Sequence, residues 1–319
     1  AGDVPLGTQG NLFGITGGEG TGKSNYVAAI VAGCICPAGA EVDTLGIQIT
    51  ANGRHKAVLL YDTEQSEVQL FKNVGNLLAR AKQPDKPDEL KAFCLTGMSR
   101  KERLNAIVQS MDKFYYQYGG IQLVVIDGIA DLVKSANDEA ESVAVIDELY
   151  RLAGIYNTCI LCVLHFVPNG LKLRGHLGSE LQRKAATILS IEKDEEPAQS
   201  VVKALKVRDG SPLDVPLMLF AWDKEAGMHV YKGEKPREEK EKRKERELVN
   251  VARDIFGRQT RITYIDLCEQ LQQVLDIKER TAKSYIRFMR ERDIITKETA
   301  NQSCFVIGSY NLQKNASCP

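Results

Sequence analysis

The stretch Gly17-Gly18-Glu19-Gly20-Thr21-Gly22-Lys23-Ser24 decides how the rest of this 319-residue sequence is interpreted. It has the pattern G-x-x-x-x-G-K-S and lies between an apolar run, residues 11–16, and a helical pattern that begins at Lys23. Glycine backbone amides can approach phosphate oxygens closely, and the positive end of a helix dipole favours the same negative charge. The stretch therefore predicts a phosphate-binding loop between a strand and a helix.

The side chains that follow predict a nucleoside triphosphate and a divalent cation as ligands. Lys23 is expected to reach the β- and γ-phosphate oxygens, and Ser24 to coordinate Mg²⁺. Asp127 ends the apolar run 121–127 and would hold the ion through a water, although a buried structural aspartate is the alternative. We expect ATP, or GTP, with Mg²⁺, bound by Gly17, Gly18, Glu19, Gly20, Thr21, Gly22, Lys23, Ser24 and Asn25.

The position of a further carboxylate separates the classes of phosphate-loop proteins, because a carboxylate must orient or deprotonate the attacking water. Proteins of the AAA+ and ABC kinds place a glutamate directly after the strand-ending aspartate, whereas Gly128 follows it here, which disfavours those classes. The run 59–66, Leu-Leu-Tyr-Asp-Thr-Glu-Gln-Ser, carries carboxylates at the end of an earlier strand. Glu64 is therefore the expected general base and Asp62 the second choice; an exposed acid in a surface turn is the alternative.

The order Lys23, Glu64, Asp127 resembles the RecA-like ATPases, in which the base lies on the strand between the two nucleotide-binding motifs. The resemblance implies a role for His165, which follows the apolar run 158–164 where RecA-like motors carry a polar residue that senses the γ-phosphate. An imidazole can donate a hydrogen bond to a phosphate oxygen in either protonation state. A histidine that bonds only to the backbone is the competing interpretation.

Two cationic segments extend the resemblance to the RepA-like and DnaB-like hexameric helicases. The glycine-rich segment 167–176 takes the position of a central-pore DNA loop, in which Lys172 and Arg174 would bind backbone phosphates. The strand end 206–210 is similar to one that projects a basic pair into the neighbouring subunit's ATP site, which makes Lys206 and Arg208 catalytic candidates. The resemblance implies single-stranded DNA as a partner and a homo-hexamer. A surface loop and a solvent-facing hairpin are the respective alternatives.

The spacing of the apolar runs predicts an α/β fold up to about residue 232. Buried strands are expected at 11–16, 57–62, 92–96, 121–127 and 158–165, with helices at 23–32, 66–82, 99–118 and 137–156 between them. This alternation favours a RecA-like, mainly parallel sheet with helices on both faces. Closely spaced runs at 187–192, 201–207, 215–222 and 228–231 predict an antiparallel extension.

The rest of the sequence predicts a second, smaller domain. Every residue of 237–247 is charged, so we expect an exposed helical linker at 233–248 between a RecA-like domain at 1–232 and a C-terminal domain at 249–319. Helical patterns at 249–256, 264–274 and 279–292, followed by two short strands, resemble a winged helix-turn-helix domain. Arg280, Lys283 and Arg287 lie on the helix that would contact duplex DNA, although such domains also bind proteins.

Composition limits the classes of protein to be considered. The 42 basic and 42 acidic residues cancel, so any nucleic-acid surface must come from local clustering. No apolar run reaches the roughly 18 residues needed to span a bilayer and the start lacks signal-peptide features, so we expect a cytoplasmic protein with no membrane partner. Cys159 and Cys162 lie in an apolar run and are expected to be buried rather than to bind metal. The sequence begins at Ala1 without methionine, which suggests a processed or truncated chain and leaves room for a preceding domain.

Together these features predict an ATP-hydrolysing, ring-forming motor on single-stranded DNA, such as a replicative or mobile-element helicase. An ATP-switched DNA-binding regulator without unwinding activity is the main alternative. A small-molecule phosphotransferase shares the phosphate loop but leaves the C-terminal domain unexplained.

Overall fold

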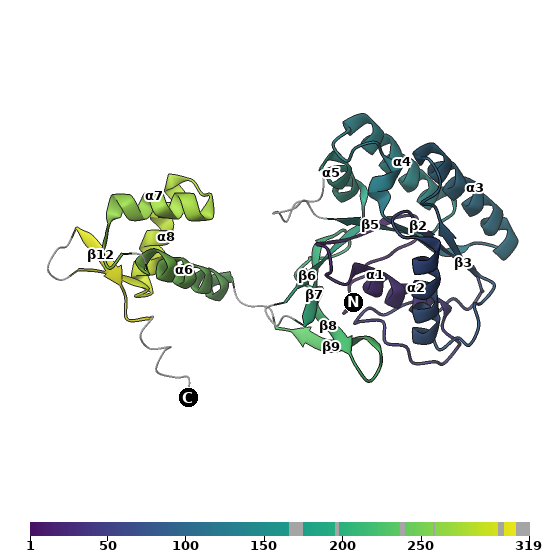
Figure 1. Cartoon of the computed structure of the whole chain (residues 1–319), viewed down its shortest axis with the longest axis horizontal. Coiled ribbons are helices and arrows are strands. Elements are labelled where there is room, and N and C mark those ends of the chain that lie inside the picture. The colour runs from purple at the N-terminus through teal and green to yellow at the C-terminus, as the bar shows by residue number, and fades with distance from the viewer. Residues whose placement is uncertain (166–174, 195–197, 237–239, 258, 299–302, 311–319) are drawn as a thin grey trace. The chain divides into compact units, whose positions relative to one another are not determined.

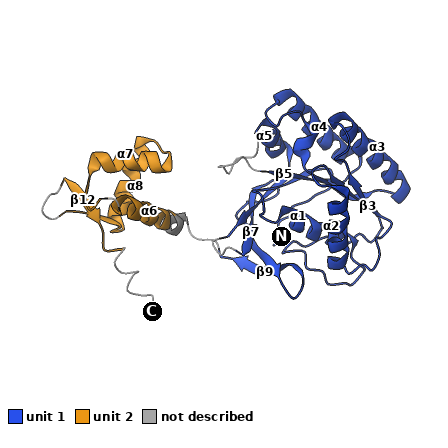
Figure 2. Ribbon diagram, viewed as in Figure 1, with its two compact units in different colours: residues 1–236 blue, residues 237–319 orange. Residues whose placement is uncertain are grey.

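The computed structural model of the chain consists of two compact units, residues 1–236 and residues 237–319 (Figure 2). The structure describes residues 1–165, 175–194, 198–236, 240–257, 259–298 and 303–310. The first unit has a buried apolar core on each face of its sheet, and the second unit has a core of its own. Within the described ranges, no helix is both long enough and apolar enough to cross a membrane.

A nine-stranded sheet forms the centre of the first unit, in the order β3-β2-β4-β5-β1-β6-β7-β8-β9 over the residues that the structure describes (Figure 1). Strands β1 to β6 are parallel to one another, and β7, β8 and β9 continue the sheet with antiparallel pairings. The strands are β1 (Leu12–Gly17), β2 (Ala57–Asp62), β3 (Leu90–Cys94), β4 (Ile121–Asp127), β5 (Cys159–His165), β6 (Thr187–Lys193), β7 (Gln199–Val207), β8 (Leu217–Asp223) and β9 (Met228–Lys235).

Helices cover both faces of this sheet. One apolar core joins α1 and α2 to the sheet and a second joins α3, α4 and α5 to the opposite face, as Figure 1 also shows. The helices are α1 (Lys23–Ile35), α2 (Glu67–Arg80), α3 (Arg100–Tyr118), α4 (Glu139–Ile155) and α5 (Gly175–Lys184), with a short 3-10 helix at Ile129–Leu132. This arrangement confirms the predicted RecA-like α/β fold with its antiparallel extension.

The parallel strands bring distant residues to one edge of the sheet. All six residues of β1 and of β2 are buried, because both faces of the sheet are covered by helices. In the strand register, Gly17 at the end of β1 lies opposite His165, and Asp62 at the end of β2 lies opposite Asp127. The carboxyl ends of four strands therefore meet beside the phosphate loop.

Two helix starts in the first unit differ from those expected. Helix α5 begins at Gly175, inside the segment 167–176 that we expected to be loop. Gly175 has φ +63° and an added Cβ would overlap the carbonyl oxygen of Ala136, so this start requires glycine. Helix α4 begins at Glu139 rather than at residue 137, and its cap is Asp138, whose carboxylate accepts a hydrogen bond from the Glu141 amide at 3.0 Å.

The second unit contains α6 (Lys240–Phe256), β10 (Ile262–Thr263), α7 (Tyr264–Leu275), α8 (Glu279–Glu291), β11 (Ile295–Lys297) and β12 (Cys304–Ile307). The three strands form an antiparallel sheet in the order β10-β12-β11 over the described residues. Apolar residues of all three helices and of the sheet share one core.

The boundary between the units lies at Pro236 because β9 continues to Lys235, beyond the expected limit of 232. Residues 240–247 of the charged run belong to helix α6, which continues into the core of the second unit, so this part of the run is not a separate linker. Lys244 lies over the rings of Tyr285 and Phe288, with its ammonium 4.7 and 4.3 Å from the centroids, which fixes this part of α6 against α8.

Candidate nucleotide site

The phosphate loop joins β1 to α1, as its sequence predicts, and Lys23 lies folded against it. The Lys23 ammonium donates hydrogen bonds to the carbonyl oxygens of Gly17 at 3.0 Å and Gly18 at 2.7 Å. The Thr21 hydroxyl donates to the same Gly18 carbonyl at 2.9 Å and tightens the turn. Burial lowers the pKa of Lys23, against the opposing effects of Asp127, Glu64 and Glu19. The ammonium therefore lies among carboxylates at the mouth of the loop.

Two glycines of the loop are required by close contacts with strands β6 and β8. A Cβ on Gly17 would overlap the carbonyl oxygen of Ile191 in β6. Gly22 precedes α1 with φ +93°, and a Cβ there would lie 2.9 Å from the ring of Phe220 in β8. The loop is thus packed against β6 and β8 on one side, while its lysine faces the strands on the other side.

Asp127 and Ser24 meet at the carboxyl edge of β4, where the sequence predicts a magnesium site. Ser24 lies beside Asp127, and its hydroxyl lowers the pKa of that carboxyl group, against the stronger effects that raise it. Asp127 keeps some accessible surface at the sheet edge, yet burial of its carboxyl group, followed by the charges of Asp62 and Glu64, raises its pKa to about 7. An excess of carboxylate charge beside a hydroxyl oxygen is an environment that favours a hard cation. The residues present therefore fit Mg²⁺.

The turn after β2 presents Glu64 and uses Asp62 for support. Asp62 is 3% exposed, and one of its carboxylate oxygens accepts hydrogen bonds from the backbone amides of Glu64 at 3.0 Å and Gln65 at 2.8 Å. The Glu64 side chain is 36% exposed. Because a general base must reach the water that it deprotonates, this geometry favours Glu64 over Asp62.

Thr63 and Gly128 hold this turn against the end of β4. The Thr63 hydroxyl is within 3.1 Å of the Asp127 carbonyl oxygen and 2.8 Å of the Gly128 carbonyl oxygen. Gly128 has φ +95°, and a Cβ there would overlap the Thr63 hydroxyl and lie 2.7 Å from Cγ of Glu64. In the sequence, Gly128 is notable only because other classes carry a glutamate at this position. In the structure, its lack of a side chain leaves room for Glu64, which follows the neighbouring strand β2.

His165 joins Lys23 to Glu64. Its Nδ1 lies 3.2 Å from the Lys23 ammonium, and its Nε2 lies 3.4 Å from a Glu64 carboxylate oxygen. Since a charged lysine can only donate, Nδ1 accepts and the ring carries its hydrogen on Nε2, facing the carboxylate. The interpretation of His165 as a backbone-bonded strand end does not describe these contacts.

Lys206 and Arg208 lie at the other edge of the sheet. Lys206 donates to the carbonyl oxygens of Gln182 at 2.7 Å and Arg183 at 3.1 Å, and Arg208 donates to the Lys184 carbonyl oxygen at 3.2 Å. These carbonyls end helix α5, next to the start of β6. The basic pair is therefore separated from the phosphate loop of the same chain by the length of a strand.

The candidate DNA-binding residues fall into two groups. Lys172 and Arg174 lie outside the described residues. Arg280, Lys283 and Arg287 are exposed on α8, but Lys283 pairs with Glu279 at 2.7 Å and Arg287 pairs with Glu291 at 2.9 Å. Acidic neighbours on the same helix therefore offset part of the positive charge of this face.

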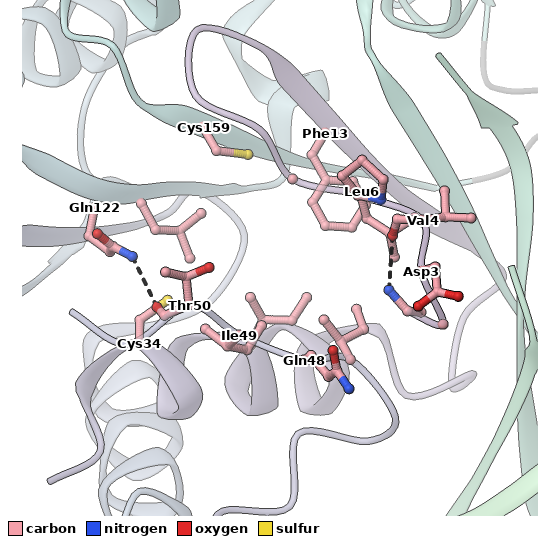
Figure 3. A pocket seen from close by; sticks show the side chains of 17 residues that line it. Asp3, Val4, Leu6, Phe13, Cys34, Gln48, Ile49, Thr50, Gln122 and Cys159 are labelled. Carbon is pink, nitrogen blue, oxygen red and sulfur yellow. Dashed lines mark hydrogen bonds between the residues drawn. The ribbon is translucent and has the colours of Figure 1, made fainter. Parts of the chain in front are cut away.

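A cavity of about 710 Å³ lies far from this chemistry, at the amino ends of β1, β4 and β5 (Figure 3). Phe13, Cys34 and Cys159 contribute to its walls, and Gln122 bonds there to the Thr50 carbonyl oxygen at 3.2 Å. Nucleotides bind α/β sheets at the carboxyl edge, so this cavity is not the nucleotide site. As expected for strand cysteines, Cys159 and Cys162 are buried.

A RecA-like sheet with a phosphate loop, a strand-end carboxylate pair and a linking histidine defines a nucleotide-dependent P-loop ATPase. Comparison with protein families also finds an ATPase family: a family model described as an AAA domain matches residues 4–169, more than half of the 319 residues, and the chain belongs to this family. The family thus carries the AAA description even though Gly128, rather than a glutamate, follows Asp127, the feature that disfavoured the AAA+ class in the sequence. Comparison with curated proteins found no match. The family match spans Lys23, Glu64, Asp127 and His165 and ends before Arg208.

Proposed function

We propose that the protein is an ATP-hydrolysing, ring-forming motor that acts on single-stranded DNA. The supporting observation is the series of contacts from Lys23 through His165 to Glu64. It joins the lysine that would bind the terminal phosphate to the carboxylate that would activate water. His165 also ends β5 directly before the segment that carries Lys172 and Arg174, so a change at the phosphate has a short route to the proposed DNA loop.

Each side chain has a role that follows from the atoms it presents. Lys23 would exchange the loop carbonyls for phosphate oxygens. Glu64 would accept a proton from the attacking water, and the Nε2–H of His165 would hold the carboxylate in position. Mg²⁺, held by Ser24 and through a water by Asp127, would neutralise charge on the phosphates.

Lys206 and Arg208 would act in the site of a neighbouring subunit. They lie near Asn11 before β1, with Arg208 3.2 Å from its amide oxygen, whereas the phosphate loop follows the other end of β1. The strand between them is roughly 17 Å long. This separation supports a site completed between subunits, and hence a hexameric ring as in the helicases that the sequence resembles.

A complementation experiment tests this arrangement. Glu64→Gln should reduce turnover by about 10²–10⁴ and Arg208→Ala by about 10³–10⁵, each with ATP binding retained. Mixing the two inactive variants should restore part of the turnover, because some subunit interfaces then combine an intact Glu64 with an intact Arg208. No recovery in the mixture, or normal turnover of Arg208→Ala as a monomer, would refute a shared site.

DNA dependence tests the motor itself. Single-stranded DNA should accelerate phosphate release, and the protein should displace a strand from a fork in the presence of ATP. The second unit, which we propose is a winged helix that uses Arg280, Lys283 and Arg287 on duplex DNA, suits the alternative of an ATP-switched regulator. Duplex binding that depends on ATP without any strand displacement would establish that alternative instead.

A further inference from the structure

A row of aromatic rings begins at the phosphate loop and follows the antiparallel strands outward. Ring centroids are 5.6 Å apart between Tyr26 and Phe220, 5.6 Å between Phe220 and His229, and 5.5 Å between His229 and Trp222. Tyr26 and Phe220 are fully buried, whereas Trp222 is 55% exposed. Since Phe220 touches the position of a Cβ on Gly22, the row connects the loop to an indole that solvent reaches.

The strand order places this row on the side of the loop away from the catalytic groups. His165, Asp127 and Glu64 belong to β5, β4 and the turn after β2, on one side of β1, whereas β6, β7 and β8 follow on the other. The ribose and base of a triphosphate whose terminal phosphate faces Lys23 and His165 would extend away from those groups, and β6 to β8 lie on that side of β1. Gly17 and Gly22 of the phosphate loop pack against β6 and β8 on this same side.

The register of β8 brings Trp222 toward the edge where the nucleotide lies. Phe220 pairs with Ser200, and Ser200 pairs with Lys193 at the end of β6. Strand β8 is antiparallel to β7, which is antiparallel to β6, so β8 runs in the same direction as β1. Residues two apart share a face of a strand, and Trp222 therefore continues the Phe220 face beyond the start of α1.

We propose that Trp222, supported by His229, is the stacking platform for the base of the bound nucleotide. This inference rests on the proposed nucleotide-hydrolysing function and adds the subsite for the base. The edge of the His229 ring faces the indole, with an interplanar angle of 80°, and holds it across the β8–β9 ladder. An indole recognises the π face of a base rather than its hydrogen-bonding edge, so the site would accept ATP and GTP alike.

The surroundings of the His229 imidazole favour its neutral form and hold the ring in a fixed position beside Trp222. Burial, followed by the charges of Arg80 and Lys193, lowers the pKa of His229. Its backbone carbonyl accepts a hydrogen bond from the Arg80 guanidinium at 2.5 Å. Its Nδ1 is buried and has no hydrogen-bond partner among the residues that the structure describes. The imidazole is thus positioned by packing and by its backbone rather than by side-chain hydrogen bonds.

Fluorescence provides a direct test, because Trp222 is the only tryptophan of the sequence. ATP and ADP should quench its emission, whereas inorganic tripolyphosphate, which has no base, should bind the phosphate loop without quenching. Calorimetry should give roughly a five- to hundredfold weaker affinity of Trp222→Ala for ATP, with an unchanged affinity for tripolyphosphate. Trp222→Phe should retain most of the ATP affinity. Tyr116→Ala, which removes an aromatic ring 76% exposed on α3, is the matched control and should change neither.

The two ligands separate failure of this inference from failure of the proposed function. If ATP binds no more tightly than tripolyphosphate, or if Trp222→Ala weakens both ligands equally, the stacking platform is wrong and the phosphate site stands. If neither ligand binds the wild-type protein, the nucleotide function fails and the platform fails with it. The Lys23→Ala variant should lose both ligands and so confirms that binding occurs at the loop.

Discussion

Replacing Gly128 by alanine should damage both stability and turnover, because this position combines a restricted backbone with a crowded site. A φ of +95° costs an L-residue about 1–2 kcal/mol. The new Cβ would also overlap the Thr63 hydroxyl, whose loss from its buried carbonyl partners costs about 1–3 kcal/mol. We therefore expect the free energy of unfolding to fall by about 2–5 kcal/mol in urea titrations.

Gly128→Ala should also displace Glu64, the candidate general base. A Cβ 2.7 Å from Cγ of Glu64 must displace that side chain, and a misplacement of about 1 Å can lower turnover about a hundredfold. The phosphate loop is not in contact with the new methyl group, so calorimetric ATP affinity should stay within about threefold of wild type.

Gly233→Ala is the matched control, since Gly233 has φ +103° but no atom within 4 Å of its Cβ position. This variant should lose about 1–2 kcal/mol and keep full turnover. Equal stability losses in the two variants, together with normal turnover of Gly128→Ala, would refute the steric argument and with it the close support of Glu64.

Three further predictions concern other elements. Met111→Ala, at a fully buried position of α3, should cost about 2–5 kcal/mol in urea unfolding, whereas Tyr116→Ala on the exposed face should stay within about 0.5 kcal/mol of wild type. Asp62→Ala should lower turnover more than ATP affinity, because the turn that carries the base loses its amide acceptor; Asp62→Asn, which keeps an oxygen, should rescue most of it. Hydrogen bonds from Ser99 lower the pKa of Glu102 in the capping box of α3, so this carboxylate stabilises the fold above its ordinary pKa and loses that effect as the pH falls below it. The stability difference between wild type and Glu102→Gln should therefore shrink between pH 6 and pH 3.5 (about the range in which a carboxyl titrates), and a constant difference would contradict the capping role.

The sequence was most informative where local pattern and burial coincide. Strands β2 and β4 lie at the residues expected, because short, nearly continuous apolar runs have few other stable places in an α/β protein. Helix α5 was missed. Its buried face depends on few apolar residues, Leu177 and Leu181 among them, and it starts in a glycine-rich segment.

The sequence predicted which residues lie at the ends of the strands in the candidate site, but it did not predict the contacts that hold those residues in place. Lys23, Glu64 and Asp127 follow from the topology, since parallel strands bring their carboxyl ends to one edge. The support given by Thr63 and the space left by Gly128 depend on contacts between strands that are distant in sequence, and no periodicity reveals them. The packing of Lys244 on the rings of α8 could not be predicted for the same reason. A run of charges by itself indicates a solvated helix, and the aromatic rings that face Lys244 are distant in sequence.

Any other binding partner of Lys206 and Arg208 must displace the hydrogen bonds that these side chains already make within the chain. In the isolated chain they satisfy three carbonyl groups at the last turn of α5, where a helix presents its negative pole. A phosphate group outside this chain must compete with these carbonyl groups for Lys206 and Arg208. When the two side chains move away, the last turn of α5 loses the hydrogen bonds that cap it. Helix α5 begins at Gly175, directly after the segment with Lys172 and Arg174. In the proposed ring, binding of the basic pair to a neighbouring subunit would therefore remove the cap of the helix that follows the proposed DNA loop.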